Sequence, residues 1–367
     1  MKRIIAFFAL ACALILPISA DELYSANDFD TNSILESLPD QVKELLPNDI
    51  FDIDNASSAD IGFLSKAALK LFKAALSPAL TIFSKLLGIV VISSIIGALK
   101  NTVSSNSLSK LFDFVTGLIL MLTSFDSIEK IFEEVKSYLS ILSGVMDSFI
   151  PVMTAMSAAG GNLNEAAVSS GGLILGLNLI EKTAANCLMP VLQICFGLAM
   201  ASGIGSSLKL DGISRMVRNG LSWILGLSAA AISAVMSFQN LIASRADSLS
   251  MRAVRFAASN VPVAGGIASE AVRTVAGSLS LVKSTVGWGG IVIILLLTLP
   301  ILLQVLLTRL GVIFAENSAS ILGLDRERNL LGEISGLLGF LAAVCIIASL
   351  MFIYSLAVFA KGTAALA

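Results

Sequence analysis

The residues best suited to chemistry gather in one polar stretch, RFAASNVPVAGGIASEAVRT at residues 255–274, which long apolar runs flank on both sides. Charged side chains surround a Pro-Val-Ala-Gly-Gly sequence, where the proline removes a backbone donor and the glycines permit positive φ, so the chain can reverse there. Together with an arginine one turn earlier, the candidate residues are Arg252, Arg255, Pro262, Gly265, Gly266, Glu270 and Arg273. They predict a folded-in helix–break–helix element whose charges pair or face enclosed water; the alternative is an amphipathic hairpin on a membrane surface.

A second stretch, IPVMTAMSAAGGNLNEAAV at residues 150–168, has the same order of features: Pro-Val, Gly-Gly, then Glu-Ala-Ala-Val. Its candidate residues are Pro151, Gly160, Gly161 and Glu165. Two glutamines stand in apolar runs three and four residues after a proline, Gln193 after Pro190 and Gln304 after Pro300. Each glutamine predicts either a hydrogen bond between helices or a polar point on a path between them. We therefore expect broken-helix segments near residues 146–172 and 246–284.

Several kinds of chemistry are disfavoured by what the sequence lacks. There is no histidine, which removes Ser-His and Cys-His nucleophile pairs and the commonest metal ligand. The four cysteines lie in apolar stretches without metal-ligand spacing and are interpreted as small hydrophobic residues. They are Cys12, Cys187, Cys195 and Cys345. We expect no enzyme, cofactor, metal site or nucleic-acid partner. No carboxylate lies in the middle of an apolar run, which argues against ion-coupled transport.

The elements that position these residues must lie in a bilayer, because 56% of the 367 residues are hydrophobic, 14% are charged and mean hydropathy is +0.89. Residues 1–20 have the basic start, apolar run and small-residue exit of a secretory signal peptide; an uncleaved first span is the alternative. Residues 21–60 carry eleven acids against Lys43 alone, which predicts an acidic, loosely ordered extracytoplasmic segment with one short helix in LPDQVKELLP.

The remaining chain predicts one surface helix followed by membrane spans. In residues 61–77, Lys66, Lys70 and Lys73 share one helical face, as in an interfacial amphipathic helix. The polytopic domain, residues 78–367, has about six predicted spans: 78–99, 111–125, 187–204, 221–242, 286–307 and 334–360. Basic residues place the connections 100–110, 205–219 and 308–333 in the cytoplasm. The segment 243–285 conflicts with this rule, since it falls outside with five Lys or Arg against two acids.

Similar motifs recur at a spacing of about 105 to 115 residues. MPVLQICFGLA at residue 189 is similar to LPILLQVLLTRLG at residue 299, and SPALTIFSKLLG at residue 77 is a fainter third copy. Each unit would contain a proline-bearing downward span, a short basic turn and an upward span. The predicted fold is thus an all-α polytopic membrane protein with weak internal repeats and Gly/Pro-broken helical hairpins.

Two motifs, SFIPVMTAMSAAGG and FAASNVPVAGGIASEAVRTVAGSLSLVKSTVGWGG, together with the signal and acidic segment, resemble the stage III sporulation protein AE family of endospore-forming Firmicutes. The resemblance implies a permease-like subunit of the channel complex that links mother cell and forespore, needed for forespore development after engulfment. It places the chain in the outer forespore membrane, with its N-terminal segment in the intermembrane space. The implied partners are other membrane and ring-forming proteins of that complex and further copies of the chain. The alternative is a non-conducting scaffold that anchors ring-forming partners, which the scarcity of polar residues along the spans keeps open.

Overall fold

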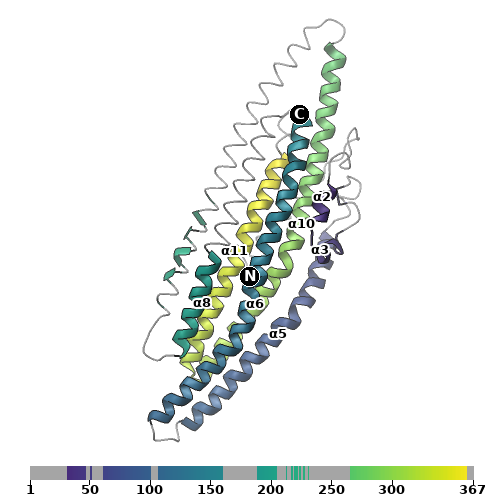
Figure 1. Cartoon of the computed structure of the whole chain (residues 1–367). Helices are drawn as coiled ribbons and strands as arrows, with labels where there is room; N and C mark the ends of the chain where they lie inside the picture. The colour runs from purple at the N-terminus through teal and green to yellow at the C-terminus, as the bar shows by residue number, and fades with distance from the viewer. Residues whose placement is uncertain are drawn as a thin grey trace.

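A computed structural model describes residues 31–46, 50–51, 61–100, 106–159, 188–204 and 265–361, with isolated positions between 212 and 230. All regular elements in these ranges are helices, which agrees with the predicted all-α class (Figure 1). They are α2 (Asn32–Glu36), α3 (Asp40–Lys43), α5 (Ile61–Lys100), α6 (Asn106–Ala159), α8 (Met189–Ile204), α10 (Gly265–Ile321) and α11 (Asp325–Lys361).

Four of the described helices are long and apolar enough to cross a membrane: Lys66–Leu99, Phe114–Ala159, Thr285–Ile321 and Asp325–Ala357. A fifth apolar stretch, Met189–Ala201, is shorter. The predicted span at residues 221–242 lies mostly outside the described residues, so the count of six and the internal repeat stay predictions. At about 1.5 Å per residue, the 57 residues of α10 extend about 85 Å, far beyond the thickness of a hydrocarbon core.

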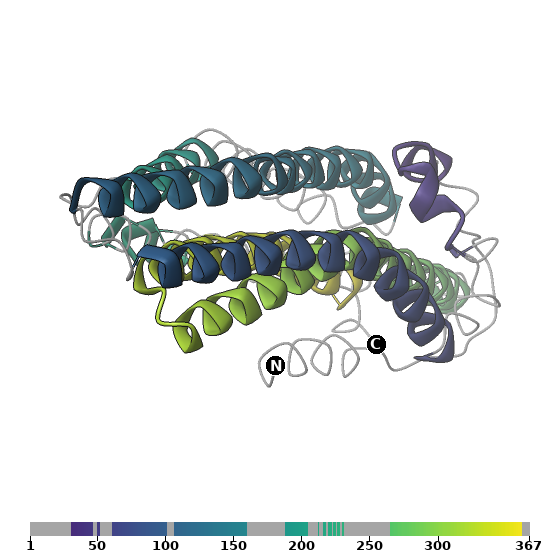
Figure 2. The ribbon, with the colours of Figure 1, turned by 90° about the horizontal axis from the view of Figure 1, so that it is seen from below.

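The helices are more continuous than the sequence predicts. Helix α6 continues through Pro151 to Ala159, and α10 runs from Gly265 through Pro300 to Ile321, so neither proline ends a helix. A proline removes one backbone hydrogen bond, but the other turns of a long packed helix keep theirs and hold the helix together. The expected separate helix at residues 61–77 is likewise part of α5, which includes Pro78. Figure 2 shows α5 bending along its length, as a proline within a helix commonly causes.

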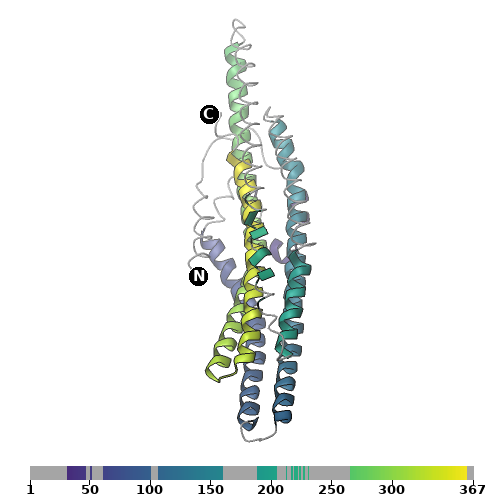
Figure 3. The ribbon, with the colours of Figure 1, turned by 90° about the vertical axis from the view of Figure 1, so that its left-hand side faces the viewer.

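Two layers of helices make up the bundle. Helices α6 and α8 lie on one side, and α5, α10 and α11 on the other (Figures 2 and 3). Helix α10 packs against α11, α5 and α6, and α8 packs against α6 and α11. Between the layers, Gly290 of α10 meets Phe149 of α6 and Leu356 of α11. Phe196 of α8 stacks on Phe125 of α6, with ring centroids 5.8 Å apart.

The connections α5–α6 and α10–α11 share one end of the bundle, because Gly97 near the end of α5 lies against Leu324 of the α10–α11 turn. The sequence predicted that these two connections share a side, and the geometry agrees. The predicted connection 308–333 was wrong in extent, because α10 continues to Ile321 and α11 begins at Asp325.

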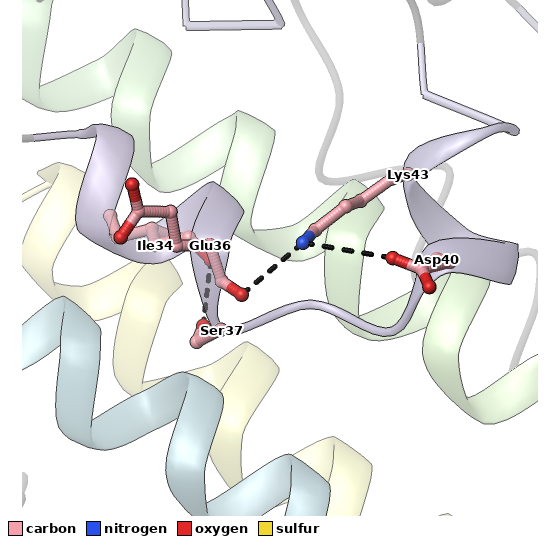
Figure 4. A network of polar contacts seen from close by, with 5 residues as sticks. All are labelled: Ile34, Glu36, Ser37, Asp40 and Lys43. Atoms are coloured by element: carbon pink, nitrogen blue, oxygen red, sulfur yellow. Dashed lines mark hydrogen bonds and ion pairs between the residues drawn. The ribbon is translucent and has the colours of Figure 1, made fainter.

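The acidic N-terminal segment packs against α6 and α10, away from the end of the bundle that holds these two connections. The expectation of loose order was therefore wrong for its described residues. Ile34, Ile50 and Phe51 are buried, and Phe51 meets Phe149 edge-to-face with ring centroids 6.4 Å apart. Helix α3 is the short helix predicted within LPDQVKELLP, and α2 precedes it; α2 contacts α6 and α3 contacts α10. Figure 4 shows Lys43 bridging α2 and α3: its Nζ donates to the Glu36 carbonyl at 3.3 Å and lies 4.0 Å from the Asp40 carboxylate.

Candidate functional site

A tight turn fixes how α10 and α11 face each other. Gly323 has φ +70°, a conformation that glycine adopts without strain, and it stands just after the end of α10. The Leu324 amide donates to the Ala319 carbonyl at 2.9 Å, and the Gly323 amide to the Ser320 carbonyl at 3.2 Å. This pair of bonds is the Schellman arrangement that closes a helix. The hairpin therefore turns within three residues, and its antiparallel register is set there.

Two charged side chains of α10 lie in gaps that glycines of α11 leave open. A Cβ on Gly339 would lie 2.8 Å from the guanidinium carbon of Arg309, and a Cβ on Gly332 would lie 3.1 Å from Oε1 of Glu316. Arg309 and Glu316 are seven residues apart, as are Gly332 and Gly339, so both pairs lie on one face of the hairpin two turns apart. We call Arg309, Glu316, Gly332 and Gly339 the glycine-notch pairs.

Further carboxylates are enclosed at the start of α11. Glu333 is 2% exposed and Glu327 is 7% exposed, although both lie in the candidate span Asp325–Ala357. Ionisable side chains in membrane helices are costly, and they are usually kept for ion, proton or substrate handling. An enclosed carboxylate can take up a proton or pair with a cation, and a guanidinium can pair with an anion. The α10–α11 hairpin therefore carries the buried carboxylates of the described helices.

Polar contacts between side chains also join α10 to α6. The Tyr138 hydroxyl of α6 lies 3.0 Å from Thr298 Oγ1 of α10, and Thr298 also donates to the Ile294 carbonyl at 2.6 Å. Nearer the turn, the Gln304 amide donates to Glu134 of α6. In α11, Ser349 donates back to the Cys345 carbonyl at 2.9 Å. Gln304 thus makes the helix–helix hydrogen bond that was one of its two predicted roles.

The structure does not gather the other predicted site residues. Pro151 lies on an exposed part of α6, and Pro190 and Gln193 are exposed on α8. Gly265, Gly266, Glu270 and Arg273 lie in the first turns of α10, which begins at Gly265 and continues without interruption into the next span. The helix–break–helix element stays a prediction, because its first arm and Pro262 lie outside the described residues. Pro300 lies inside α10, four residues before Gln304. Six predicted residues lie outside the described ranges: Gly160, Gly161, Glu165, Arg252, Arg255 and Pro262.

Sequence reasoning missed the hairpin charges because it took residues 308–333 as a loop in water. A signal was present: Arg309 and Glu316, and Gly332 and Gly339, repeat at seven residues, the spacing of two helical turns. Glu316 and Glu333 fall inside the candidate spans Thr285–Ile321 and Asp325–Ala357, both near the turn that joins them, so they do not contradict the prediction that no carboxylate lies in the middle of an apolar run. Among the described residues, no group of three or more Cys, Asp or Glu side chains is arranged to hold a metal ion. Cys195 and Cys345 are buried, as small hydrophobic residues would be.

Four long apolar helices, two of them joined by a tight turn, with a few polar contacts between them, indicate a polytopic helical membrane protein. The chain belongs to the stage III sporulation protein AE family, whose model matches residues 45–363. It is similar to stage III sporulation protein AE of Bacillus subtilis (strain 168), with 24% identity over 281 residues, 75% of this chain and 70% of that relative. No solved structure matches the chain. The family resemblance read from the two motifs is therefore confirmed, and a role in sporulation follows from it.

Proposed function

We propose that this chain is a permease-like membrane subunit of the channel complex that links mother cell and forespore, needed for forespore development after engulfment. It would lie in the outer forespore membrane with its N-terminal segment in the intermembrane space, beside membrane and ring-forming partners and further copies of itself. The proposal assigns it no catalytic step and no cofactor. Membership of the sporulation family and four candidate spans support this assignment.

One observation carries the permease-like role: two buried and two half-buried ionisable side chains gather on two apolar helices near the turn that joins them. Glu333 and Glu327 are buried, and Arg309 and Glu316 lie against the glycines of the glycine-notch pairs. Removing such groups from water is unfavourable, so a purely structural helix pair is more stable with apolar residues there. Their presence fits a hairpin that handles charged passengers or protons.

The second candidate is a non-conducting scaffold that anchors ring-forming partners. The glycine-notch pairs also favour it, because Arg309 and Glu316 fill the space beside their glycines and could serve to align the two helices. In addition, the polar contacts Tyr138–Thr298 and Glu134–Gln304 are satisfied within the bundle, which is what rigid helix packing requires.

The experiment removes the charge of each carboxylate while keeping the size and shape of its side chain. Glu333→Gln and Glu316→Gln would be introduced separately into the sporulating organism, with Glu129→Gln, an exposed position of α6, as the matched control. Heat-resistant spores, the amount of chain in the membrane and its co-purification with complex partners would be measured in each strain.

We expect Glu333→Gln and Glu316→Gln to lower spore counts at least tenfold while the chain stays in the membrane and keeps its partners. Spore counts equal to those of Glu129→Gln in both variants would refute a role for the enclosed charges. Loss of partners together with spores would identify the scaffold role instead.

A further inference from the structure

The exposed side chains of α6 change in character along the helix. From residue 111 to 125 the exposed positions are mainly large and apolar: Leu111, Phe114, Val115, Ile119, Leu122 and Phe125. From 126 to 136 they are charged: Asp126, Glu129, Lys130, Glu133, Glu134 and Lys136. From 137 onward they are small or polar: Ser137, Ser140, Gly144, Asp147, Pro151 and Ala155. One continuous helix thus presents three different surfaces to its surroundings.

Helix α5 changes in the same way at the same height. Before its proline, Lys66, Lys70 and Lys73 are exposed together with two large apolar residues, Leu69 and Phe72, and five large apolar residues are exposed after it. The latter are Leu80, Val91, Ile92, Ile95 and Leu99. Lys85 is also exposed, and its long side chain can reach back toward the lysines near the start of the helix.

Two contacts establish that the charged parts of α5 and α6 are level with each other. Gln304 of α10 bonds Glu134 in the charged part of α6. Seven residues farther along α10, Gly311 lies against Phe83 and Ala79 of α5, just beyond the lysines. The charges of both helices therefore form one belt around the middle of the bundle.

Among the described side chains of α10, residues 285–321, large apolar ones are exposed only on the turn side of this belt, at Leu310, Phe314 and Ile321. Its most apolar stretch lies on the opposite side, yet it is covered by protein: Val292, Ile293 and Ile294 have no exposed surface. In the most apolar 18-residue stretch of α10, 67% is buried inside the protein, compared with 22% in the corresponding stretch of α5. Hydropathy alone would place this stretch in lipid, although the fold already covers it.

The docked segment beside that covered stretch is exposed to a polar medium. Its Phe51 lies against Gly289 of α10, and the Asp40 carboxylate of the same segment is 99% exposed. Glu36 and Glu44 are exposed as well. Fully exposed carboxylates do not lie in hydrocarbon. The surroundings of the bundle at this height are therefore water or headgroups.

We propose that, among the described residues, lipid acyl chains contact an apolar collar made of residues 80–99 of α5, 111–125 of α6 and 310–321 of α10. The bundle beyond the charged belt, with α6 137–159, α10 285–303 and the docked segment, stands in water. The twenty residues of α5 in the collar span about 30 Å at about 1.5 Å per residue, the thickness of a hydrocarbon core. The belt then lies at the headgroups, and this placement does not depend on the proposed function.

The test measures what each surface touches. Leu122→Cys, Ile92→Cys, Glu129→Cys and Ser140→Cys would be made singly in the full-length chain after replacement of its native cysteines. Each would carry a nitroxide label in reconstituted vesicles. Collision with oxygen, which concentrates in hydrocarbon, is compared with collision with a nickel chelate that stays in water.

We expect Leu122 and Ile92 to favour oxygen at least tenfold over Ser140, Ser140 to favour the nickel chelate, and Glu129 to lie between them. An oxygen-rich signal at Ser140 would overturn the proposal, because the bundle beyond the belt would then lie in lipid. Shielding of Leu122 from both reagents would overturn it too, since a protein surface and not lipid would cover the collar. In a label-free check, Leu122→Lys should reduce membrane-inserted chain several-fold and Ser140→Lys should not.

Discussion

Docking of the N-terminal segment on α10 depends on a glycine, and Gly289→Ala should release it. A Cβ at position 289 would lie 2.8 and 2.9 Å from two ring carbons of Phe51 and 3.4 Å from the Ile50 carbonyl. Carbon atoms in good contact are about 3.5 to 4.0 Å apart, so the ring must move by most of an ångström or leave its site.

The expected change in docking free energy follows from two opposing effects of the substitution. Overpacking of this kind costs about 1 to 3 kcal/mol. Alanine in place of glycine inside a helix returns about 0.5 to 1 kcal/mol, which stabilises α10 whether or not the segment is docked. Docking itself depends on burial of Ile34, Ile50 and Phe51, each worth about 1.5 to 3 kcal/mol. We therefore expect docking to weaken by about 1 to 3 kcal/mol, with α10 itself intact.

Hydrogen exchange of the amides in residues 31–46 measures this directly in detergent-solubilised protein. Exchange there should quicken by about fivefold or more in Gly289→Ala, because 1 kcal/mol changes an opening equilibrium by about that factor. Gly144→Ala is the matched control, since a Cβ there meets nothing within 4 Å. Equal exchange in the two variants would show that Phe51 does not pack against α10 as described.

Three further substitutions test other parts of the bundle. Tyr138→Phe should lower the free energy of unfolding by only about 1 kcal/mol, because Thr298 keeps its bond to the Ile294 carbonyl. Unfolding in mixed detergent measures this free energy, and a loss above about 3 kcal/mol would contradict the prediction. Gly323→Ala should lower the free energy of unfolding by about 1 to 2 kcal/mol, because alanine is strained at the positive φ of this position. The control Gly88→Ala, where a Cβ would meet nothing within 4 Å, should not destabilise the protein, and equal stability of the two variants would refute the turn geometry. Phe196→Ala should lower the free energy of unfolding by about 3 to 5 kcal/mol, because it empties the space between Phe125 and Phe132. It should also speed hydrogen exchange in residues 189–204, and unchanged exchange there would mean that other contacts hold α8.

The features of the fold that depend on composition and local pattern could be predicted from the sequence. Sustained apolar runs predicted helices at 78–99, 286–307 and 334–360, and each lies within a described helix. The signal for a docked N-terminal segment was also present, since Ile34, Leu38 and Val42 are spaced four residues apart and could share a face. It was overlooked because eleven acids in the same region indicated solvation.

Continuity of the helices could not be predicted, because a proline gives the same local signal at a break as at a bend. Pro151 and Pro300 remain inside helices because neighbouring helices pack against the turns on either side. The notched site was beyond reach for a related reason. Which glycine of α11 faces Arg309 depends on where the chain turns, and the sequence suggested a long loop at 308–333 where the structure has a three-residue turn.

The turn and the charged site are therefore one structural unit. Gly323 places α11 so that Gly339 opposes Arg309 and Gly332 opposes Glu316 at the same time. One residue inserted in the turn would rotate α11 by about 100° relative to its connection, since a helix has about 3.6 residues per turn. Side chains larger than glycine would then face Arg309 and Glu316, and both charges would have to leave the helix pair for lipid or headgroups. The fit of both charged side chains beside their glycines thus depends on a third glycine that touches neither charge, and this dependence explains why the site cannot be recognised from any one of its residues.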